Sequence, residues 1–254
     1  MAAPLTMLTI AADGKSDIGK VRQANQDAFA VDTDHHVYVV ADGMGGHSGG
    51  EVASWKAVEM VLATLRGAQA TDATPAESAD RALVRAIQAA NEHVFRMASE
   101  DRKLHGMGTT LVAVQLVGPT ALIGSVGDSR VYLWRDNQLR QVTHDHSLVN
   151  EYVRLGTLSA EEASTHPLKH IISRAIGVHL SVEVDHFTIP LKPGDLFLLC
   201  SDGLTNMLNQ NEIAAAIAAG GAEPAAVCAE CVNRANAKGG LDNITAVAVH
   251  CVAV

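Results

Sequence analysis

Four aspartates at the ends of short apolar, β-rich runs are the residues of this sequence best suited to metal chemistry. They are Asp42, Asp128, Asp202 and Asp242. A single aspartate of this kind is ordinary, because Asp-Gly after a strand is a common hairpin turn. Four such positions in one chain favour a shared carboxylate cluster, with Asp42 as its centre.

Converging carboxylates require a cation or a proton. Two carboxylates about 4 Å apart repel each other by roughly 4 kcal/mol at an effective dielectric near 20. Ligand sets made only of oxygen select hard divalent ions, Mg²⁺ or Mn²⁺, over zinc. Two such ions can lower the pKa of a shared water and clamp a phosphoryl group for in-line attack. Arg22 could then bind the remaining phosphate oxygens with its planar fork of N–H groups.

The apolar patterns predict the elements that position these residues. Strands are expected over 5–11, 27–32, 37–41, 109–117, 121–126, 130–134, 138–142, 181–189, 195–201 and 244–252. Helices are expected over 50–66, 74–99, 213–219 and 224–235, with an irregular region of short helices over 146–180. Because strands and helices come in blocks, the sequence favours an α+β fold with mostly antiparallel sheets.

Several local features lead to specific expectations. Asp13-Gly14 lacks a strong strand before it and is expected to form a plain turn. Trp55 falls on the apolar face of its helix and is expected to pack in the core or against a sheet, as is Trp134. Capping boxes are predicted to open helices at Thr74 and at Ser159.

Composition limits the class of protein. The 254 residues are 48% hydrophobic, which suits one domain over residues 1–254, and no apolar run is long enough to cross a membrane. The start has neither the basic nor the long apolar region of a secretory signal. The net charge of −9 argues against non-specific nucleic-acid binding. We expect the four cysteines to be buried, reduced thiols of a cytoplasmic protein, because the single CxxC lacks a second pair.

The sequence does not favour two other types of site. The glycines over 43–50 lack the third glycine of a dinucleotide-binding loop, and the sequence has no GK[ST] of a P-loop. His144 and His146 form an HxH pair, but in a chain with 12 histidines chance proximity is the better interpretation. Thr109 and Thr110 are expected to be strand residues with a packing role.

The ordered set of short motifs resembles bacterial metal-dependent serine/threonine protein phosphatases of the PPM (PP2C) family. Each motif is weak alone, whereas the ordered set is highly specific. The motifs are Arg22-Gln23-Ala24-Asn25-Gln26-Asp27, Asp42-Gly43-Met44-Gly45-Gly46, Gly108-Thr109-Thr110, Gly127-Asp128-Ser129-Arg130, Thr143-His144-Asp145-His146-Ser147, Ile172-Ser173-Arg174-Ala175-Ile176-Gly177, Ser201-Asp202-Gly203-Leu204 and Asp242-Asn243-Ile244-Thr245.

The resemblance implies a β-sandwich of two antiparallel sheets flanked by pairs of α-helices, with metal ions in a cleft at one end. It also implies that Asp42 bridges the first and second ions and that the Gly43 carbonyl binds the second. Asp202 and Asp242 would hold the first ion, and Asp128 with Asp202 would hold a third.

The remaining implied roles concern the substrate. Arg22 would bind the substrate phosphate, and Asp27, or Gln26 beside it, would support metal-bound water. Residues 146–180 would form the mobile flap near the active site. Taken alone, Arg22 would instead be a surface arginine, and Asp27 could pair with a basic residue or cap a turn.

One position departs from the family pattern. Animal members carry a histidine two residues after the first aspartate, proposed as general acid, where this sequence has Met44. His47 could protonate the leaving oxygen, or it could equally be a surface or capping histidine. Metal-bound water is the alternative acid.

The expected function is a Mn²⁺- or Mg²⁺-dependent phosphoserine/phosphothreonine phosphatase that reverses a protein kinase. We expect a cytoplasmic monomer that acts on phosphorylated proteins and binds neither nucleic acid nor a membrane. The alternative is a catalytically silent phosphatase fold that binds a phosphoprotein or kinase as a regulatory module. Silent relatives should lose metal aspartates, whereas Asp42, Asp128, Asp202 and Asp242 are all present.

Overall fold

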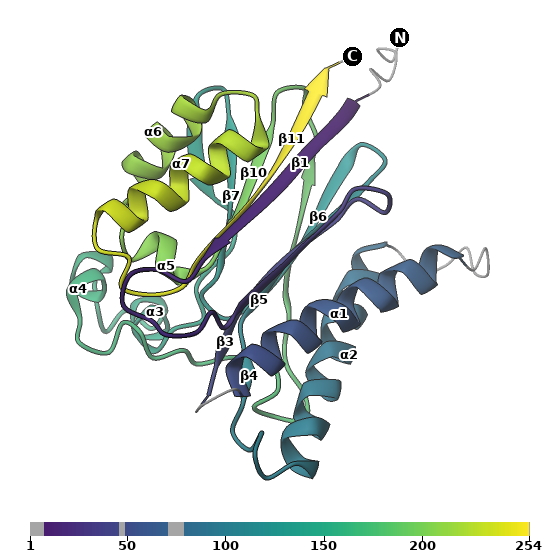
Figure 1. The fold of residues 1–254 in the computed structure, drawn as a ribbon, viewed down its shortest axis with the longest axis vertical. Coiled ribbons are helices and arrows are strands. Elements are labelled where there is room, and N and C mark those ends of the chain that lie inside the picture. The colour runs from purple at the N-terminus through teal and green to yellow at the C-terminus, as the bar shows by residue number, and fades with distance from the viewer. Residues whose placement is uncertain (1–7, 46–48, 71–78, 254) are drawn as a thin grey trace.

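A computed structural model describes residues 8–45, 49–70 and 79–253, and the structural statements below concern these residues. Two antiparallel sheets pack face to face, and a pair of long helices covers the outer face of each (Figure 1). The expected α+β sandwich with flanking helix pairs is confirmed.

The first sheet joins the two ends of the described chain. Its strand order is β1 (Leu8–Asp17), β11 (Ile244–Ala253), β10 (Leu196–Cys200), β7 (Arg130–Arg135) and β8 (Gln138–Gln141). β1 and β11 pair along their whole length, from Leu8 opposite Ala253 to Asp17 opposite Ile244. This pairing brings the loop after β1 beside the loop before β11.

The second sheet carries Asp42, the first aspartate of the cluster along the chain. Its strand order is β2 (Asp27–Asp32), β3 (Val37–Met44), β5 (Leu111–Val117), β6 (Thr120–Val126) and β9 (Asp185–Pro190). The short strand β4 (Gly108–Thr109) pairs with the end of β3. Asp27 lies opposite Asp42 in the register of β2 and β3.

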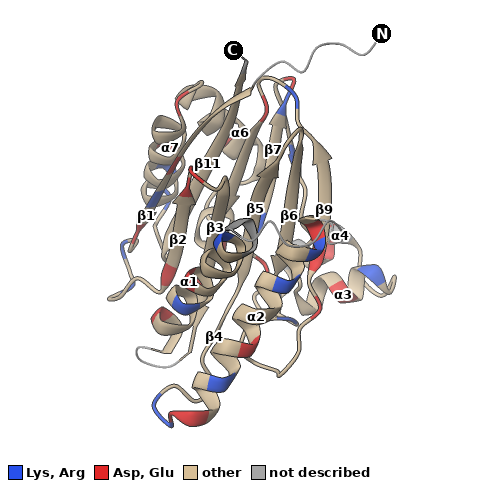
Figure 2. Cartoon of the chain, turned by 90° about the vertical axis from the view of Figure 1, so that its right-hand side faces the viewer, with Lys and Arg blue, Asp and Glu red and all other residues tan. Residues whose placement is uncertain are grey.

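The helices close the outer faces of the two sheets. α1 (Gly49–Ala70) and α2 (Ala79–Glu100) cover the second sheet, and α6 (Gln210–Gly220) and α7 (Pro224–Ala237) cover the first. Three shorter helices lie near one end of the sandwich (Figure 1): α3 (Leu148–Arg154), α4 (Ala160–Thr165) and α5 (Asp202–Thr205). Charged residues of α1 and α2 lie on their outer sides, whereas the strands are mostly uncharged (Figure 2).

Apolar side chains fill all three layer boundaries. The boundary between the sheets includes Tyr38, Val40, Phe197 and Val247, each fully buried. One face of α2 is apolar, and Leu83 and its neighbours at helical spacing are buried against the second sheet. The four cysteines are buried and free, as expected.

The structure corrects three predicted elements. Asp13-Gly14 is not a turn but lies inside β1, where a side chain on Gly14 would meet the Phe29 ring at 2.4 Å. The strand predicted over 109–117 is broken at Thr110, which belongs to neither β4 nor β5. The strand predicted over 181–189 begins only at Asp185.

The predicted burial of Trp55 is wrong, because its side chain is 56% exposed. The α1 face that meets the sheet is centred on Ala53, Ala57 and Val61, whose small side chains let the helix approach closely. Trp134 packs partly buried against the core of the first sheet.

The helix starts have different outcomes. The Ser159 capping box is present, whereas Thr74 lies outside the described residues. No helix in the described part of the chain combines the length and apolarity needed to span a membrane.

Candidate active site

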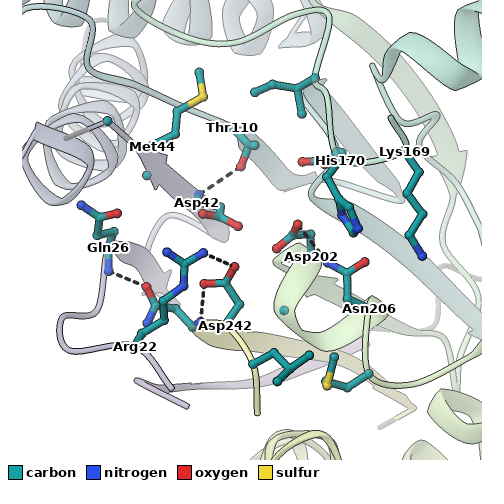
Figure 3. A pocket seen from close by; sticks show the side chains of 18 residues that line it. Arg22, Gln26, Asp42, Met44, Thr110, Lys169, His170, Asp202, Asn206 and Asp242 are labelled. Atoms are coloured by element: carbon teal, nitrogen blue, oxygen red, sulfur yellow. Dashed lines mark hydrogen bonds and ion pairs between the residues drawn. The ribbon is translucent and has the colours of Figure 1, made fainter. Parts of the chain in front are cut away.

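One pocket of about 640 Å³ gathers the residues that the sequence singled out. Asp42, Asp128, Asp202 and Asp242 all line it, together with Arg22, Gln26 and Gly43. In Figure 3 the side chains of Arg22, Asp42, Asp202 and Asp242 face a common centre. Because these residues come from both sheets, the pocket lies at the end of the sandwich, between the two sheets.

Glycine is required beside Asp42 for steric reasons. A Cβ on Gly43 would lie 2.1 Å from the Gly50 carbonyl oxygen and 2.6 Å from that of Gln26. The start of α1 and the end of the β1–β2 loop therefore pack directly against the backbone that carries Asp42. This close approach of backbones agrees with the role expected for glycine after the strand.

Asn243 positions the arginine loop, and the sequence reasoning missed this role. Its side-chain amide donates to the Ile18 and Ala24 carbonyl oxygens, at 2.9 Å each, and its carbonyl oxygen accepts from the Gln26 N–H at 2.9 Å. The residue after Asp242 thereby holds both ends of the segment that carries Arg22. The adjacency of Asn243 to a predicted ligand was the only sequence signal.

The carboxyl groups in the pocket favour a bound proton or cation. Burial, and then the charges of Asp27, Asp202, Asp128 and Asp242, raise the pKa of Asp42 well above its usual range. Burial also raises the pKa of Asp202, although a hydrogen bond to the Asp42 carboxyl opposes the shift. Burial and the charge of Asp202 raise the pKa of Asp128 to about 7.

Asp27 lies behind Asp42 and is buried. Its Oδ2 accepts hydrogen bonds from the Ser201 hydroxyl at 2.8 Å and the Thr245 hydroxyl at 2.6 Å. Its Oδ1 has no hydrogen-bond partner among the described residues. Burial raises the pKa of Asp27 to about 6, although these two hydroxyl groups lower it. The alternatives of a basic partner and a turn cap are not what the structure shows.

Arg22 lies at the mouth of the pocket with its side chain half exposed. One guanidinium nitrogen donates to Asp242 Oδ2 at 2.6 Å. This hydrogen bond, with the charges of Asp242, Asp42 and Asp202, raises the pKa of Arg22. The guanidinium therefore faces the cluster and is not an isolated surface charge.

The donor set fits a hard divalent ion. In the described part of the chain, no three His, Cys, Asp or Glu side chains as placed surround a common position for one ion. The pocket nevertheless concentrates carboxylate oxygens whose pKa values are raised by burial first and by the neighbouring negative charges second. A divalent cation would relieve that repulsion, and oxygen-only donors match Mg²⁺ and Mn²⁺.

The histidines that the sequence contains near the motifs differ in their positions relative to the pocket. His47 lies outside the described residues. His170, with Lys169, reaches the pocket from the region 146–180, which no local pattern had indicated (Figure 3). His146 is buried, and its Nδ1 accepts from the Gly127 N–H at 3.0 Å, so it supports the loop before Asp128. His144 packs edge-on against the Phe187 ring.

Comparison with known proteins agrees with this geometry. The sequence profile described as Protein phosphatase 2C matches residues 14–239. The chain belongs to the protein phosphatase 2C family of metal-dependent serine/threonine protein phosphatases.

Individual relatives match over nearly their whole length. The serine/threonine phosphatase stp of Listeria monocytogenes is 41% identical over 244 residues, covering 94% of this chain and 95% of the relative. The structure of the Mycobacterium tuberculosis phosphatase PstP/Ppp is similar, with a TM-score of 0.85, 34% identity and coverage of 97% and 100%. A structure of the PstP catalytic domain in complex with two manganese ions has a TM-score of 0.81, the same 34% identity and the same coverage.

The raised carboxyl pKa values predict that the EDTA-treated protein loses stability as pH rises from 5 to 8. A carboxyl group with a raised folded-state pKa keeps a proton that the unfolded chain releases, so stability falls as pH passes from the unfolded to the folded value. For Asp27, with a pKa of about 6 against 3.8, the full effect is about 3 kcal/mol, of which about 1.4 kcal/mol is lost between pH 5 and 8. Urea unfolding in EDTA at several pH values measures it.

The Asp27→Asn variant isolates this contribution. Burial lowers the pKa of His146, which acts in the opposite direction because a buried neutral histidine stabilises the fold as pH rises. Wild type should therefore lose more stability between pH 5 and 8 than Asp27→Asn does. Equal pH dependence of the two proteins would contradict the assignment.

Proposed function

We propose that this chain hydrolyses phosphoserine and phosphothreonine in proteins, with Mn²⁺ or Mg²⁺ held by the carboxylate cluster. The convergence of Asp42, Asp128, Asp202 and Asp242 with Arg22 in one pocket is the observation that carries this proposal. Asp42 and the Gly43 carbonyl would hold two ions with Asp202 and Asp242. Phosphate monoesters suit such a site, since both the attacking and the leaving oxygen need charge stabilisation.

The protein's own groups have distinct tasks in this mechanism. Bound divalent ions would supply an activated water and neutralise charge on the phosphoryl oxygens. Arg22 would orient the phosphate, because its guanidinium can offer two parallel N–H donors. Its ion pair with Asp242 is half exposed, so exchanging that carboxylate for a phosphate costs little.

Three finer assignments follow the same geometry. Asp128, with Asp202, would hold a third ion at the side of the pocket nearest residues 146–180. Asp27 would accept a hydrogen bond from water in the site through its unpartnered oxygen. His47 or water remains the proposed proton donor to the leaving oxygen.

The proposal extends to the biological setting. A cognate Ser/Thr kinase would supply the phosphorylated proteins, and four buried free thiols suit a reducing compartment such as the cytoplasm. We propose one monomeric phosphatase domain over residues 1–254, with 146–180 as its flap and neither nucleic acid nor a membrane as partner. The full-length pairing of β1 with β11 supports one domain.

Turnover after metal removal tests the proposal. Protein treated with EDTA should release no phosphate from a phosphothreonine peptide, and adding Mn²⁺ or Mg²⁺ should restore activity because the ions supply the nucleophile and the charge. Asp34→Asn, which changes an exposed aspartate outside the pocket, serves as a control and should behave like wild type. A protein that binds phosphopeptide but never turns it over with either ion would support the silent binding module.

A further inference from the structure

Thr110 occupies the break between β4 and β5, at the floor of the pocket. Its side chain is buried, with 4% exposure, and the residue lines the pocket beside Asp42 (Figure 3). A buried hydroxyl needs hydrogen-bond partners to offset its lost hydration. The partners of this hydroxyl show what the residue does.

Toward Asp42, Thr110 binds both backbone polar groups. The Thr110 N–H donates to the Asp42 carbonyl oxygen at 2.9 Å, and the Asp42 N–H donates to Thr110 Oγ1 at 3.0 Å. The hydroxyl thus takes the place of a backbone carbonyl in the β ladder, which explains why the strand is broken at this residue. The Thr109 hydroxyl adds a bond to the Asp42 carbonyl oxygen at 2.8 Å.

Toward Asp128, Thr110 contacts the residues on both sides of the aspartate. Thr110 Oγ1 lies 2.6 Å from Ser129 Oγ in a buried hydrogen bond. Gly127 has a left-handed backbone, with φ of 101°, and a Cβ there would lie 2.7 Å from Thr110 Cβ and Cγ2. Thr110 therefore packs on Gly127 and bonds to Ser129, so it brackets Asp128.

We propose that the Thr110 hydroxyl is a positioning group that fixes Asp42 and Asp128 relative to each other and so sets the affinity of the cluster for divalent ions. One oxygen atom accepts from the Asp42 backbone and bonds to the neighbour of Asp128. Hydroxyl and methyl have separate tasks, since the methyl packs on Gly127. This inference rests on the proposed function, because it takes both aspartates as metal ligands.

Mn²⁺ titration by calorimetry tests this role without relying on turnover. Thr110→Val keeps the branched shape but removes the hydroxyl, and we expect Mn²⁺ to bind about 10- to 100-fold more weakly, as for other outer partners of metal ligands. Thr110→Ser keeps the hydroxyl and should stay within about threefold of wild type on the same scale.

Two further variants locate the effect. Ser129→Ala removes only the hydrogen bond between Thr110 and Ser129, beside Asp128, and should by itself weaken Mn²⁺ binding. In the double variant with Thr110→Val, the two losses should be less than additive, because both substitutions break this same bond. Thr143→Val is the matched control, since Thr143 is a buried threonine whose hydroxyl accepts the Val131 N–H at 3.1 Å outside the pocket. It should bind Mn²⁺ like wild type. Urea unfolding in EDTA reports any general loss of stability.

The outcomes are separable. If wild type binds Mn²⁺ and Thr110→Val binds it equally well, or if Thr110→Ser is as weak as Thr110→Val, the positioning role is overturned alone. If Thr110→Val does not fold, Ser129→Ala decides, and unchanged Mn²⁺ affinity in that variant overturns the role. If wild type binds no Mn²⁺, the metal assignment itself fails, and this inference fails with it.

Discussion

Replacing Asp42 with asparagine is expected to lower kcat for a phosphothreonine peptide by at least about 10³-fold, while making the EDTA-treated protein more stable at pH 8. The metal ions contribute several kcal/mol of charge stabilisation, and about 4 kcal/mol corresponds to that factor in rate. Asp42 is the most central carboxylate: burial raises its pKa most, and a set of neighbouring charges raises it further, those of Asp27, Asp202, Asp128 and Asp242.

The gain in stability has the same physical cause as the loss of activity. An ionised Asp42 is repelled by its neighbours, and a neutral amide of the same shape removes that repulsion. Residues that support activity at functional sites commonly lower the stability of the protein in this way. Steady-state kinetics at saturating Mn²⁺ and urea unfolding in EDTA measure the two effects.

Asp32→Asn is the matched control for Asp42→Asn. Asp32 is also a buried aspartate of the second sheet, but it accepts hydrogen bonds from Arg66 at 2.7 Å and from His35. Although burial raises the pKa of Asp32, these bonds outweigh it and lower that pKa below the usual value. Asp32→Asn should therefore lose stability and keep kcat. An Asp42→Asn variant that retained kcat within tenfold, or lost stability as Asp32→Asn does, would contradict the assignment.

Arg22→Ala is expected to lower kcat/KM for the same peptide by about 10²- to 10³-fold, since it removes charge-assisted hydrogen bonds worth roughly 1.5 to 3 kcal/mol each. The kcat/KM of Arg22→Lys should fall between those of wild type and Arg22→Ala, because lysine keeps the charge but lacks the planar fork of N–H groups. Stability should change little, as the ion pair with Asp242 is half exposed. Kinetics at saturating Mn²⁺ separate phosphate binding from metal binding.

Lys20→Ala is the control for charge alone. Lys20 is an exposed cation in the same loop, its backbone N–H bonded to the Gly240 carbonyl oxygen at 2.7 Å, and it does not line the pocket. Its replacement should leave kcat/KM nearly unchanged. If Arg22→Ala weakened only Mn²⁺ affinity, with kcat/KM normal at saturation, Arg22 would act on Asp242 and not on the phosphate.

The class of fold and the principal residues of the candidate site could be predicted from the sequence alone. Blocks of strand and helix patterns indicated antiparallel sheets with flanking helices, because side-chain periodicity follows directly from which face of an element is buried. Aspartates at strand ends, with Gly43 after Asp42, identified the cluster, because Asp42 and the glycine that lets other backbone segments pack against it are adjacent in the chain.

Positions that depend on distant partners could not be predicted without the packed fold. Gly14 lies in a strand because β11 pairs with it from the other end of the chain, and Trp55 is exposed because α1 packs through its alanines. Thr110 is 68 residues from Asp42, and Asn243 is 217 residues from Gln26, so neither hydrogen bond produces a local sequence pattern. Local spacing reports which residues an element can bury, whereas hydrogen bonds between distant loops exist only once the sheets have packed.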